Sequence, residues 1–325
     1  MFMKCLSFAV VVTLVGSMFP AASGAEPANL TFYQFEQTAD AVSYKSQDGE
    51  TVLRYQLKGG AEKKLSVESG CYFHPFATPA GVTVTEVAPD DHPHHRGIFL
   101  AFVEMHGEKD ADFWGWGEHA PKDGRVIVNR SVIAGGGLPQ TKSPEFVADN
   151  EWIAEGQVML KERLVVSLTR PDPRTNVLDL TYTLTPTADV TLSRWAFSGF
   201  CVRTRKDAEL TAFGPKGEVK LPNPSHVKPD TDWPAQAWYA YELGLKGDVT
   251  AGVAVIDHPR NPPVLWHNHR DIRMLNPSIV APAAVKLRGG PGAPGLVLRY
   301  RVVAYDGRTP TDELNRMAKE FAKFK

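Results

Sequence analysis

The sequence lacks three features that mark whole classes of protein: a charge excess, a cysteine framework, and long apolar runs beyond its first residues. Its 36 basic and 37 acidic residues give a formal net charge of −1, so no basic field attracts a phosphate backbone and we expect no nucleic-acid partner. Three cysteines are too few for disulfide bonds to be the main stabilisation of a fold of this length. The 43% apolar content excludes a disordered chain and predicts an ordinary globular core.

One apolar stretch lies close to the start of the chain. A lysine precedes an apolar run at residues 7–18, and small residues follow it. The run is short for a membrane-spanning helix, which takes about 20 residues, and its flanks are those of a cleaved secretory signal. We therefore predict a signal peptide at residues 1–25 and a single domain at 26–325, secreted or periplasmic, with no membrane span in the mature chain.

The mature chain keeps two cysteines, Cys71 and Cys201. In an oxidising compartment they either form one disulfide or stay as two separately buried thiols, and the sequence leaves both alternatives open. Neither is flanked by a motif that stabilises a thiolate, so we expect no nucleophilic cysteine.

Alternation of apolar and polar residues with a period of two dominates the domain. Residues 42–57 have the pattern of two strands joined by the turn pair Asp48-Gly49, a strong hairpin signal. Alternation also covers residues 152–168, 178–184 and 296–302. The 27 glycines and 25 prolines suit many turns between short strands. We expect an all-β fold, a large antiparallel β-sandwich in a single domain.

One helix is predicted at the C-terminus. Thr309 has the side chain of an N-cap, and Pro310 suits the first helical position. The apolar residues that follow recur with helical spacing and form one stripe: Leu314, Met317, Ala318 and Phe321. Such a stripe docks against a sheet, so we expect this helix to be structural.

The histidines are unevenly distributed along the chain. Eight of the ten lie within residues 92–119 and 258–269. Long loops on a β scaffold carry function more often than the strands they join. We therefore predict that the two segments meet at one rim of the sandwich and build a shared site. His74 is a weaker candidate, and we expect His226 to be an ordinary surface-loop residue.

The first segment concentrates side chains that can move protons. His94 or His95 suits acid–base catalysis because an imidazole titrates near neutral pH. Arg96 offers a planar fork for substrate oxygens, and Asp91 is a candidate substrate ligand. If the segment is extended, His92 and His94 point to one face and His95 to the other. The plain alternative is a set of loop histidines bonded to the backbone.

Carboxylates and tryptophans follow in the same part of the chain. Glu104, Asp112 and Glu118 are candidates for the carboxylate that opposes the catalytic histidine. Trp114 and Trp116 offer flat rings for the apolar face of a sugar. Alternatively, both tryptophans are core or loop-packing residues.

The second segment offers a similar set. His258 and Trp266 are candidate substrate ligands, and two further histidines repeat the i, i+2 spacing of the first segment. Imidazoles at that spacing can share one metal ion. The candidate ligands of a divalent ion, if the protein binds one, are His92, His94, His267 and His269.

A set of motifs spread over the domain resembles a known family. The motifs are Tyr72-Phe73-His74-Pro75, Gly81-Val82, residues 91–97, Asp112-Phe113-Trp114, Asp257-His258-Pro259, Asn261-Pro262, Trp266-His267 and residues 298–307. With them, the chain resembles the secreted bacterial family named methane oxygenase PmoA-like. The size and strand content of that family resemble the galactose-mutarotase-like supersandwich, and its members look like proteins of carbohydrate-degrading bacteria. The resemblance implies no established mechanism.

Three functions follow from these observations. The leading one is a secreted carbohydrate-active enzyme, a lyase, hydrolase or epimerase. It would use histidine and carboxylate acid–base chemistry on a small-molecule or oligosaccharide substrate, with or without one divalent metal ion. The alternative is a non-catalytic glycan-binding β-sandwich module, which needs the aromatic residues but not the histidines. Copper-dependent oxygenation, which the family name suggests, ranks third.

Overall fold

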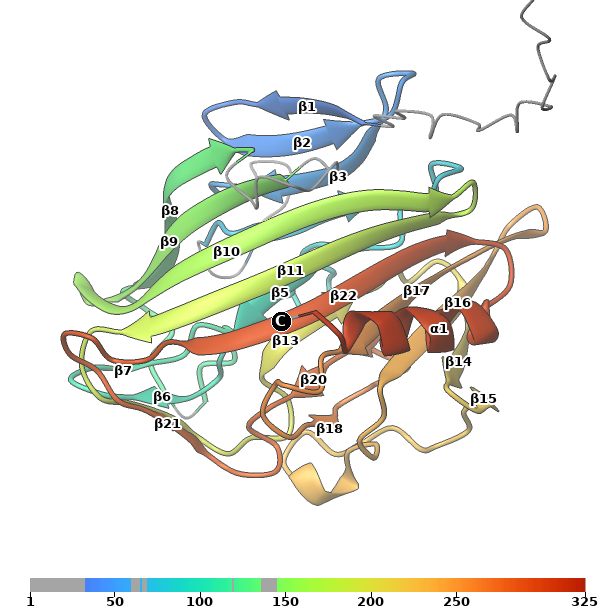
Figure 1. The fold of residues 1–325 in the computed structure, drawn as a ribbon. Coiled ribbons are helices and arrows are strands. Elements are labelled where there is room, and N and C mark those ends of the chain that lie inside the picture. Colours follow the sequence, from blue (N-terminus) through green and yellow to red (C-terminus); the bar gives the residue numbers. More distant parts are fainter. Residues whose placement is uncertain (1–32, 60–64, 66–68, 119, 136–144, 325) are drawn as a thin grey trace, which may run out of the picture. The chain divides into compact units, whose positions relative to one another are not determined.

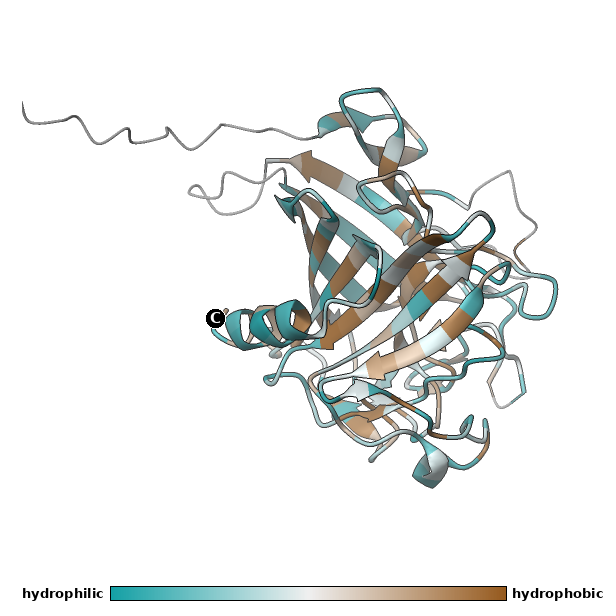
Figure 2. Cartoon of the chain, turned by 90° about the vertical axis from the view of Figure 1, so that its right-hand side faces the viewer, coloured by the Kyte–Doolittle hydropathy of each residue, from teal (hydrophilic) through white to brown (hydrophobic). Residues whose placement is uncertain are grey.

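The fold consists of antiparallel β-sheets with one helix at the C-terminal end (Figure 1). It is known from a computed structural model that describes residues 33–59, 65, 69–118, 120–135 and 145–324. The predicted signal peptide lies outside these residues. The expected all-β sandwich is confirmed, and Figure 2 shows the expected alternation of apolar and polar residues along the strands.

The first large sheet has seven described strands, five from residues 34–101 and two from later in the chain. Its spatial order is β1 (Gln34–Gln37), β2 (Ala41–Lys45), β3 (Thr51–Gln56), β4 (Tyr72–Phe76), β5 (Ile98–Ala101), β13 (Gly199–Arg203) and β19 (Met274–Leu275). The β2–β3 hairpin turns at Asp48-Gly49, as predicted. Gly49 has a φ of +85°, a conformation that glycine adopts without steric cost.

The second large sheet has nine strands and contains the longest ones. Its order is β15 (Gly217–Glu218), β14 (Glu209–Gly214), β16 (Trp238–Leu245), β17 (Val249–Asp257), β22 (Leu296–Asp306), β11 (Thr175–Pro186), β10 (Gln157–Asp172), β9 (Glu145–Ala154) and β8 (Arg125–Ala134). The β9–β10 hairpin turns at Glu155 and Gly156, both with positive φ, which is the conformation that tight two-residue hairpin turns require.

The main core lies between the two large sheets. Because side chains alternate across a strand, each sheet sends every second residue into this layer. Phe200 of β13 stacks on Tyr300 of β22 with ring centroids 4.1 Å apart, so the two sheets are joined by direct aromatic contact. Leu100, Trp152 and Leu180 are among the core residues that are almost completely buried.

Shorter elements connect the large sheets. A four-stranded sheet has the order β21 (Val285–Leu287), β12 (Val190–Leu192), β6 (Met105–His106) and β7 (Asp110–Ala111), and a two-stranded sheet pairs β18 (Leu265–Trp266) with β20 (Pro277–Ser278). One 3₁₀ turn, η1, spans Pro229–Thr231. In the described ranges, no helix has the length and apolarity needed to cross a membrane.

The C-terminal helix α1 spans Thr311–Phe321 and packs against the nine-stranded sheet beside β17 and β22 (Figure 1). Its buried residues Leu314, Met317 and Phe321 confirm the predicted apolar stripe. The predicted N-cap is wrong. Pro310 occupies that position, and the Thr309 hydroxyl instead lies 3.0 Å from a Glu242 carboxylate oxygen on β16.

Cys71 and Cys201 are free thiols. The structure therefore decides between the two alternatives in favour of separate thiols. Burial raises the pKa of both Cys71 and Cys201 well above the usual thiol range. Both stay protonated at neutral pH, so neither is a ready nucleophile.

Candidate histidine pocket

A small pocket lies where five segments of the chain converge, and four of its nine lining residues are histidines. We call it the histidine pocket; its lining residues are His92, His94, His95, Trp114, Trp116, Phe197, His226, Ile272 and Met274. The cavity volume is about 10 Å³, room for about one water molecule. Only a reacting group of a substrate, not a whole sugar ring, fits inside it as it stands.

The first wall comes from the loop before β5. Turn hydrogen bonds join the amide of His92 to the Pro89 carbonyl at 3.0 Å and the amide of His95 to the His92 carbonyl at 2.9 Å. The segment is thus folded back on itself, and the extended geometry considered from sequence is wrong. The consequence is that all three imidazoles gather, with His95 4.9 Å from His92 and 4.7 Å from His94 between ring centroids.

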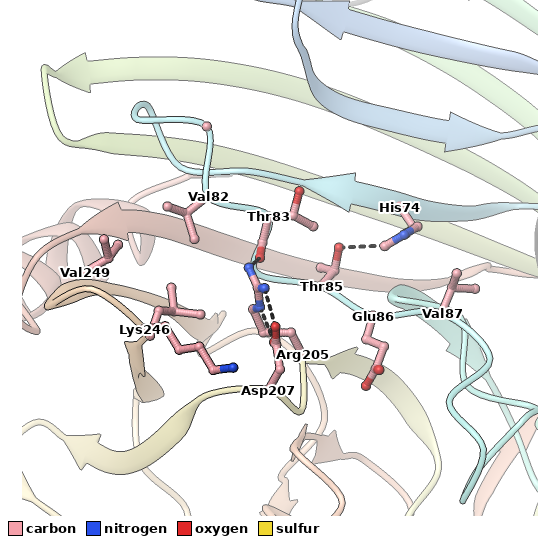
Figure 3. Close-up of a pocket in the computed structure, with 12 residues that line it drawn as sticks. His74, Val82, Thr83, Thr85, Glu86, Val87, Arg205, Asp207, Lys246 and Val249 are labelled. Carbon is pink, nitrogen blue, oxygen red and sulfur yellow. Dashed lines mark hydrogen bonds and ion pairs between the residues drawn. The ribbon is translucent and has the colours of Figure 1, made fainter.

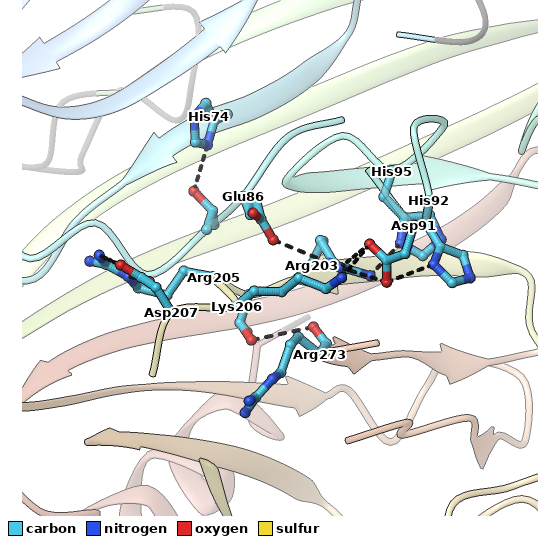
Figure 4. Close-up of polar contacts among 12 residues, drawn as sticks. His74, Glu86, Asp91, His92, His95, Arg203, Arg205, Lys206, Asp207 and Arg273 are labelled. Carbon is cyan, nitrogen blue, oxygen red and sulfur yellow. Dashed lines mark hydrogen bonds and ion pairs between the residues drawn. The ribbon is translucent and has the colours of Figure 1, made fainter. Parts of the chain in front are cut away.

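Asp91 anchors this wall through a network of charges (Figure 4). The buried Arg203 donates to both of its oxygens at 3.1 and 3.3 Å, and Lys206 lies 2.8 Å away. Burial raises the pKa of Asp91, but the Lys206 hydrogen bond and the Arg203 charge outweigh it and hold the pKa well below its usual range. Asp91 is therefore a carboxylate at any pH near neutrality.

His92 lies against this carboxylate, with its Nδ1 3.0 Å from Asp91 Oδ2. The negative charge of Asp91 favours a proton on Nδ1, although Nδ1 has no partner of hydrogen-bond geometry among the described residues. Burial nevertheless lowers the pKa of His92, so the ring is neutral at pH 7. The arrangement is that of an oriented base, an imidazole whose far nitrogen is free to accept a proton.

His94 and His95 are held differently. Arg203 Nη1 lies 3.3 Å from His95 Nδ1, and because a guanidinium can only donate, that nitrogen is the acceptor. His94 Nε2 is buried with no hydrogen-bond partner among the described residues. Burial lowers the pKa of His94 to about 3 and that of His95 well below its usual value. Both rings are neutral.

The opposite wall contains His226, which the sequence did not single out. Its Nδ1 lies 3.1 Å from His267 Nε2, and its ring stacks on His269 with centroids 4.9 Å apart. The expectation of an ordinary surface-loop residue is therefore wrong. No local pattern around His226 marks it, because its partners lie more than 40 residues away in the sequence.

The first predicted segment lines the pocket, whereas no residue of the second segment, 258–269, does so; His267 and His269 lie behind the pocket residue His226. His92, His94 and His95 contribute one wall, while the turn after His269 contributes Ile272 and Met274. Trp114 and Trp116 also line the pocket. Trp114 is fully buried, in keeping with the packing alternative, whereas Trp116 is partly exposed at the rim.

Two residues predicted as catalytic instead organise the loops around the pocket. Arg96 is buried, donates to the Phe113 carbonyl at 3.0 Å and places its guanidinium 4.8 Å from the centre of the Phe99 ring. Asp112 accepts hydrogen bonds from the backbone amides of Gly115 and Gly117 at 2.7 and 2.5 Å. Both lie outside the lining of the pocket.

Two predicted glutamates also lie outside the pocket lining. Glu104 lies 2.7 Å from His106 Nε2, close to β6, and Glu118 accepts a hydrogen bond from the Trp116 indole. Asp91 lies against the pocket residue His92, and Asp232 lies against His267, which in turn contacts the pocket residue His226.

The predicted substrate ligands of the second segment are elsewhere too. His258 packs edge-on against Phe321 of α1 with centroids 5.0 Å apart, and its Nδ1 accepts from the Arg260 amide. Trp266 is buried 5.1 Å from the Tyr239 ring. Both contribute to packing.

The predicted metal ligands do not gather around one point. Across the part of the chain that the structure describes, no group of three or more His, Cys, Asp or Glu side chains is arranged to hold a metal ion. His267 already uses both nitrogens, one toward Asp232 and one toward His226. The divalent ion stays a prediction from the sequence.

A larger open cavity lies beyond the Asp91 network (Figure 3). Its volume is about 760 Å³, within the range that small-molecule ligands occupy. Polar side chains line much of it, among them His74, Glu86, Arg205 and Lys246. Glu86 Oε2 lies 3.7 Å from Arg203 Nε, so one guanidinium connects this cavity to Asp91 and the histidine pocket.

Comparison with known proteins identifies a family but no activity. No curated protein matches the chain significantly. The model of one family, described as a family of unknown function, matches residues 44–319 and so covers most of the chain. The chain therefore belongs to DUF6807, a family of unknown function.

Proposed function

We propose that the protein is a carbohydrate-active enzyme that moves protons between neutral histidines and a sugar substrate. The observation that carries this proposal is the convergence of His92, His94, His95 and His226 on one pocket. Burial keeps the pKa of each below its usual value, so each ring is neutral at pH 7 and has one nitrogen without a proton. The same proposal includes export of the protein from the cell and its relation to the PmoA-like family.

The proposed base is His92. Its contact with Asp91 sets the tautomer and orients the ring, and the network of Arg203 and Lys206 keeps that carboxylate ionised. A substrate proton would be taken by Nε2, and the imidazolium formed would be stabilised by the adjacent negative charge. His94, with its unpartnered Nε2, would hydrogen-bond a substrate hydroxyl beside the reacting group.

The same geometry favours proton transfer over two-carboxylate hydrolysis. Glycosidases of the usual kind place two carboxyl groups on either side of the scissile bond. Neither Asp91 nor Asp232 lines the pocket, and each faces a histidine. We therefore favour elimination or epimerisation, in which a base removes a proton next to a carbonyl or at a hydroxyl.

Whole sugar units would bind in the larger cavity, whose described lining residues are distinct from those of the histidine pocket. A pyranose ring does not fit the histidine pocket, but a cavity of about 760 Å³ accepts one or two sugar units. Glu86, Arg205 and Lys246 offer donors and acceptors for hydroxyl or carboxylate groups. Trp116 at the rim of the histidine pocket offers a ring face.

A screen of oxidised and unoxidised oligosaccharides in D₂O tests the proposal. Mass spectrometry would detect cleavage, and deuterium uptake into recovered sugar would report proton abstraction. We expect turnover that His92→Ala reduces at least 100-fold, the usual contribution of a general base. The matched control is His106→Ala, since His106 lies at the surface beside Glu104. Equal activity of His92→Ala and the wild type would reject the assignment.

A non-catalytic glycan-binding module is the second candidate. The partly exposed Trp116 and the open cavity are the observations that favour it. Glycan binding with unchanged affinity in His92→Ala and no turnover of any bound glycan would support it against the enzyme. Metal analysis of the same preparation tests the predicted divalent ion, and stoichiometric copper would support the oxygenase.

A further inference from the structure

We propose that the buried guanidinium groups of Arg96 and Arg125 form a binding site for a small monovalent anion, with chloride as the ligand. The site is separate from the histidine pocket and needs no carbohydrate, so this inference goes beyond the proposed function. Arg125 is the first residue of β8, and Arg96 lies in the loop before β5. They are only 5% and 1% exposed, which is rare for arginine.

The two arginines are buried cations with unused donors. The Nε, Nη1 and Nη2 atoms of Arg125 are all enclosed, and none has a hydrogen-bond partner among the described residues. Arg96 donates from Nη2 to the Phe113 carbonyl at 3.0 Å, but its Nε and Nη1 are likewise enclosed without a partner. Because a guanidinium can only donate, these five nitrogens require acceptors that the described part of the chain does not supply.

Backbone contacts bring both arginines to one loop. The Asp112 amide donates to the Pro121 carbonyl at 2.7 Å, which closes residues 112–121 into a loop that leads into β8 and Arg125. Arg96 is bonded to Phe113 of the same loop. Among the charges that act on Arg125, that of Arg96 has the largest effect. The two guanidinium groups therefore share one buried region at the base of this loop.

The acidic groups of this region do not balance both positive charges. The Asp112 carboxylate acts on both arginines, but its oxygens accept hydrogen bonds from the Gly115 and Gly117 amides at 2.7 and 2.5 Å. Asp123, the other acid that acts on Arg125, is exposed. Two buried positive charges thus meet one buried carboxylate. Because an uncompensated buried charge is strongly unfavourable, one bound monovalent anion would restore the balance.

The enclosure of the site limits the size of the anion. Less than a tenth of either arginine is exposed, so the ligand must lie inside the protein with all its atoms. Chloride is a single atom that can accept from several N–H groups at once. Sulfate and phosphate carry further oxygens that would each need a donor. A sugar carboxylate would need an opening for its ring, and neither arginine lines either of the cavities described above.

A bound anion would join two segments that form the wall of the histidine pocket. His94, two residues before Arg96, lines the pocket, and so do Trp114 and Trp116 of the loop that leads to Arg125. An anion held by both guanidinium groups would fasten these segments to each other. Because it binds only the folded chain, it would raise the stability of the protein by mass action.

Thermal unfolding in sodium chloride tests the site without any substrate. Sodium gluconate replaces the chloride at constant ionic strength, so that screening of surface charges stays the same. We expect Tm to rise with chloride concentration to a plateau, by at least about 2 °C. Sodium bromide should have the same effect. Equal Tm values in chloride and gluconate would overturn the proposal.

Arg125→Met removes the charge and the donors of Arg125 with little change in side-chain length. The Tm of this variant should not respond to chloride. The matched control is Arg130→Met, because Arg130 lies on the same strand but pairs with Glu151 at 2.7 Å near the surface. That control should keep the full response. If Arg125 is instead bonded to buried water, Arg125→Met will lose the same Tm at every chloride concentration, and the assignment is rejected.

Arg125→Lys serves if the methionine variant does not fold. Lysine keeps the charge but not the planar fork. It should raise the chloride concentration at half of the plateau at least about tenfold, which corresponds to the loss of one charge-assisted hydrogen bond. An unchanged chloride response in Arg125→Lys would contradict binding by the guanidinium.

Crystals grown in sodium bromide locate the anion directly, because bromide scatters X-rays anomalously. We expect a bromide beside the Arg96 and Arg125 guanidinium groups of the wild type. Bromide at surface positions only would refute the site. The result is independent of the carbohydrate screen. An anion at the site without turnover of any sugar rejects the proposed function alone, and turnover in a protein that is indifferent to chloride rejects the anion site alone.

Discussion

Replacement of Arg203 by methionine tests whether one buried guanidinium holds the first wall of the pocket. Arg203 is fully buried and donates to Asp91 and to His95. Arg203→Met keeps the length of the side chain but removes the charge and every donor. Asp91 then loses the hydrogen bonds that Arg203 donates to both of its oxygens, and His95 Nδ1 loses the Arg203 donor.

The expected loss of unfolding free energy in Arg203→Met follows from the surroundings of Arg203 and Asp91. Breaking a buried ion pair costs about 3–5 kcal/mol, because the surviving charge stays uncompensated. Asp91 is 29% exposed and keeps Lys206 at 2.8 Å, so solvent and a second cation recover part of the loss. We therefore expect a destabilisation near the lower limit, about 3 kcal/mol.

Urea unfolding followed by tryptophan fluorescence measures this difference. Arg205→Met is the matched control, because Arg205 pairs with the exposed Asp207 and should contribute less than about 1 kcal/mol. The reasoning is refuted if Arg203→Met is no less stable than Arg205→Met. It is also refuted if the ring resonances of His92 and His95 are unchanged in the Arg203 variant.

Three further changes test the core and the loops. Burial raises the pKa of Glu162 to about 7, above its unfolded value of 4.5. Protonated Glu162 therefore contributes to the free energy of unfolding below pH 4.5, and this contribution is lost as pH rises through 7. Urea unfolding should show the wild type losing roughly 3 kcal/mol of free energy of unfolding relative to Glu162→Gln between pH 4.5 and 8. Gly97→Ala places a Cβ 2.3 Å from the Phe73 carbonyl oxygen, so its Tm should fall further than that of Gly49→Ala, whose Cβ meets nothing within 4 Å. Phe321→Ala should cost about 3–5 kcal/mol in urea unfolding by undocking α1, and a loss below 1 kcal/mol would contradict the packing.

Much of the fold could be predicted from local pattern. Period-two alternation placed the long strands, and Asp48-Gly49 placed the β2–β3 hairpin, because turn geometry depends on a few adjacent residues. The helix was predicted for the same reason, although its cap was not. Thr309 hydrogen-bonds Glu242 on another strand, a tertiary contact that outweighs its preference for capping.

The candidate site was predicted less completely. Residues close in sequence to the first histidines, such as Glu104 and Asp112, were expected to share their site. The loops direct both side chains away from the pocket. Glu104 contacts His106, and Asp112 accepts a hydrogen bond from the backbone amide of Gly115. Conversely, His226 and Asp232 had no motif of their own, and only the meeting of distant loops gives them partners.

The sequence by itself determined the balance of charge, the all-β pattern, the C-terminal stripe and the concentration of histidines in two loop segments. Each of these depends on composition or on neighbours a few residues away, where periodicity and turn chemistry act. Only the tertiary structure decided which histidines face the pocket, which carboxylates stand behind them and whether the cysteines pair. Those outcomes depend on burial and on tertiary contacts such as that between Asp232 and His267, since desolvation and hydrogen-bond partners are properties of the folded chain.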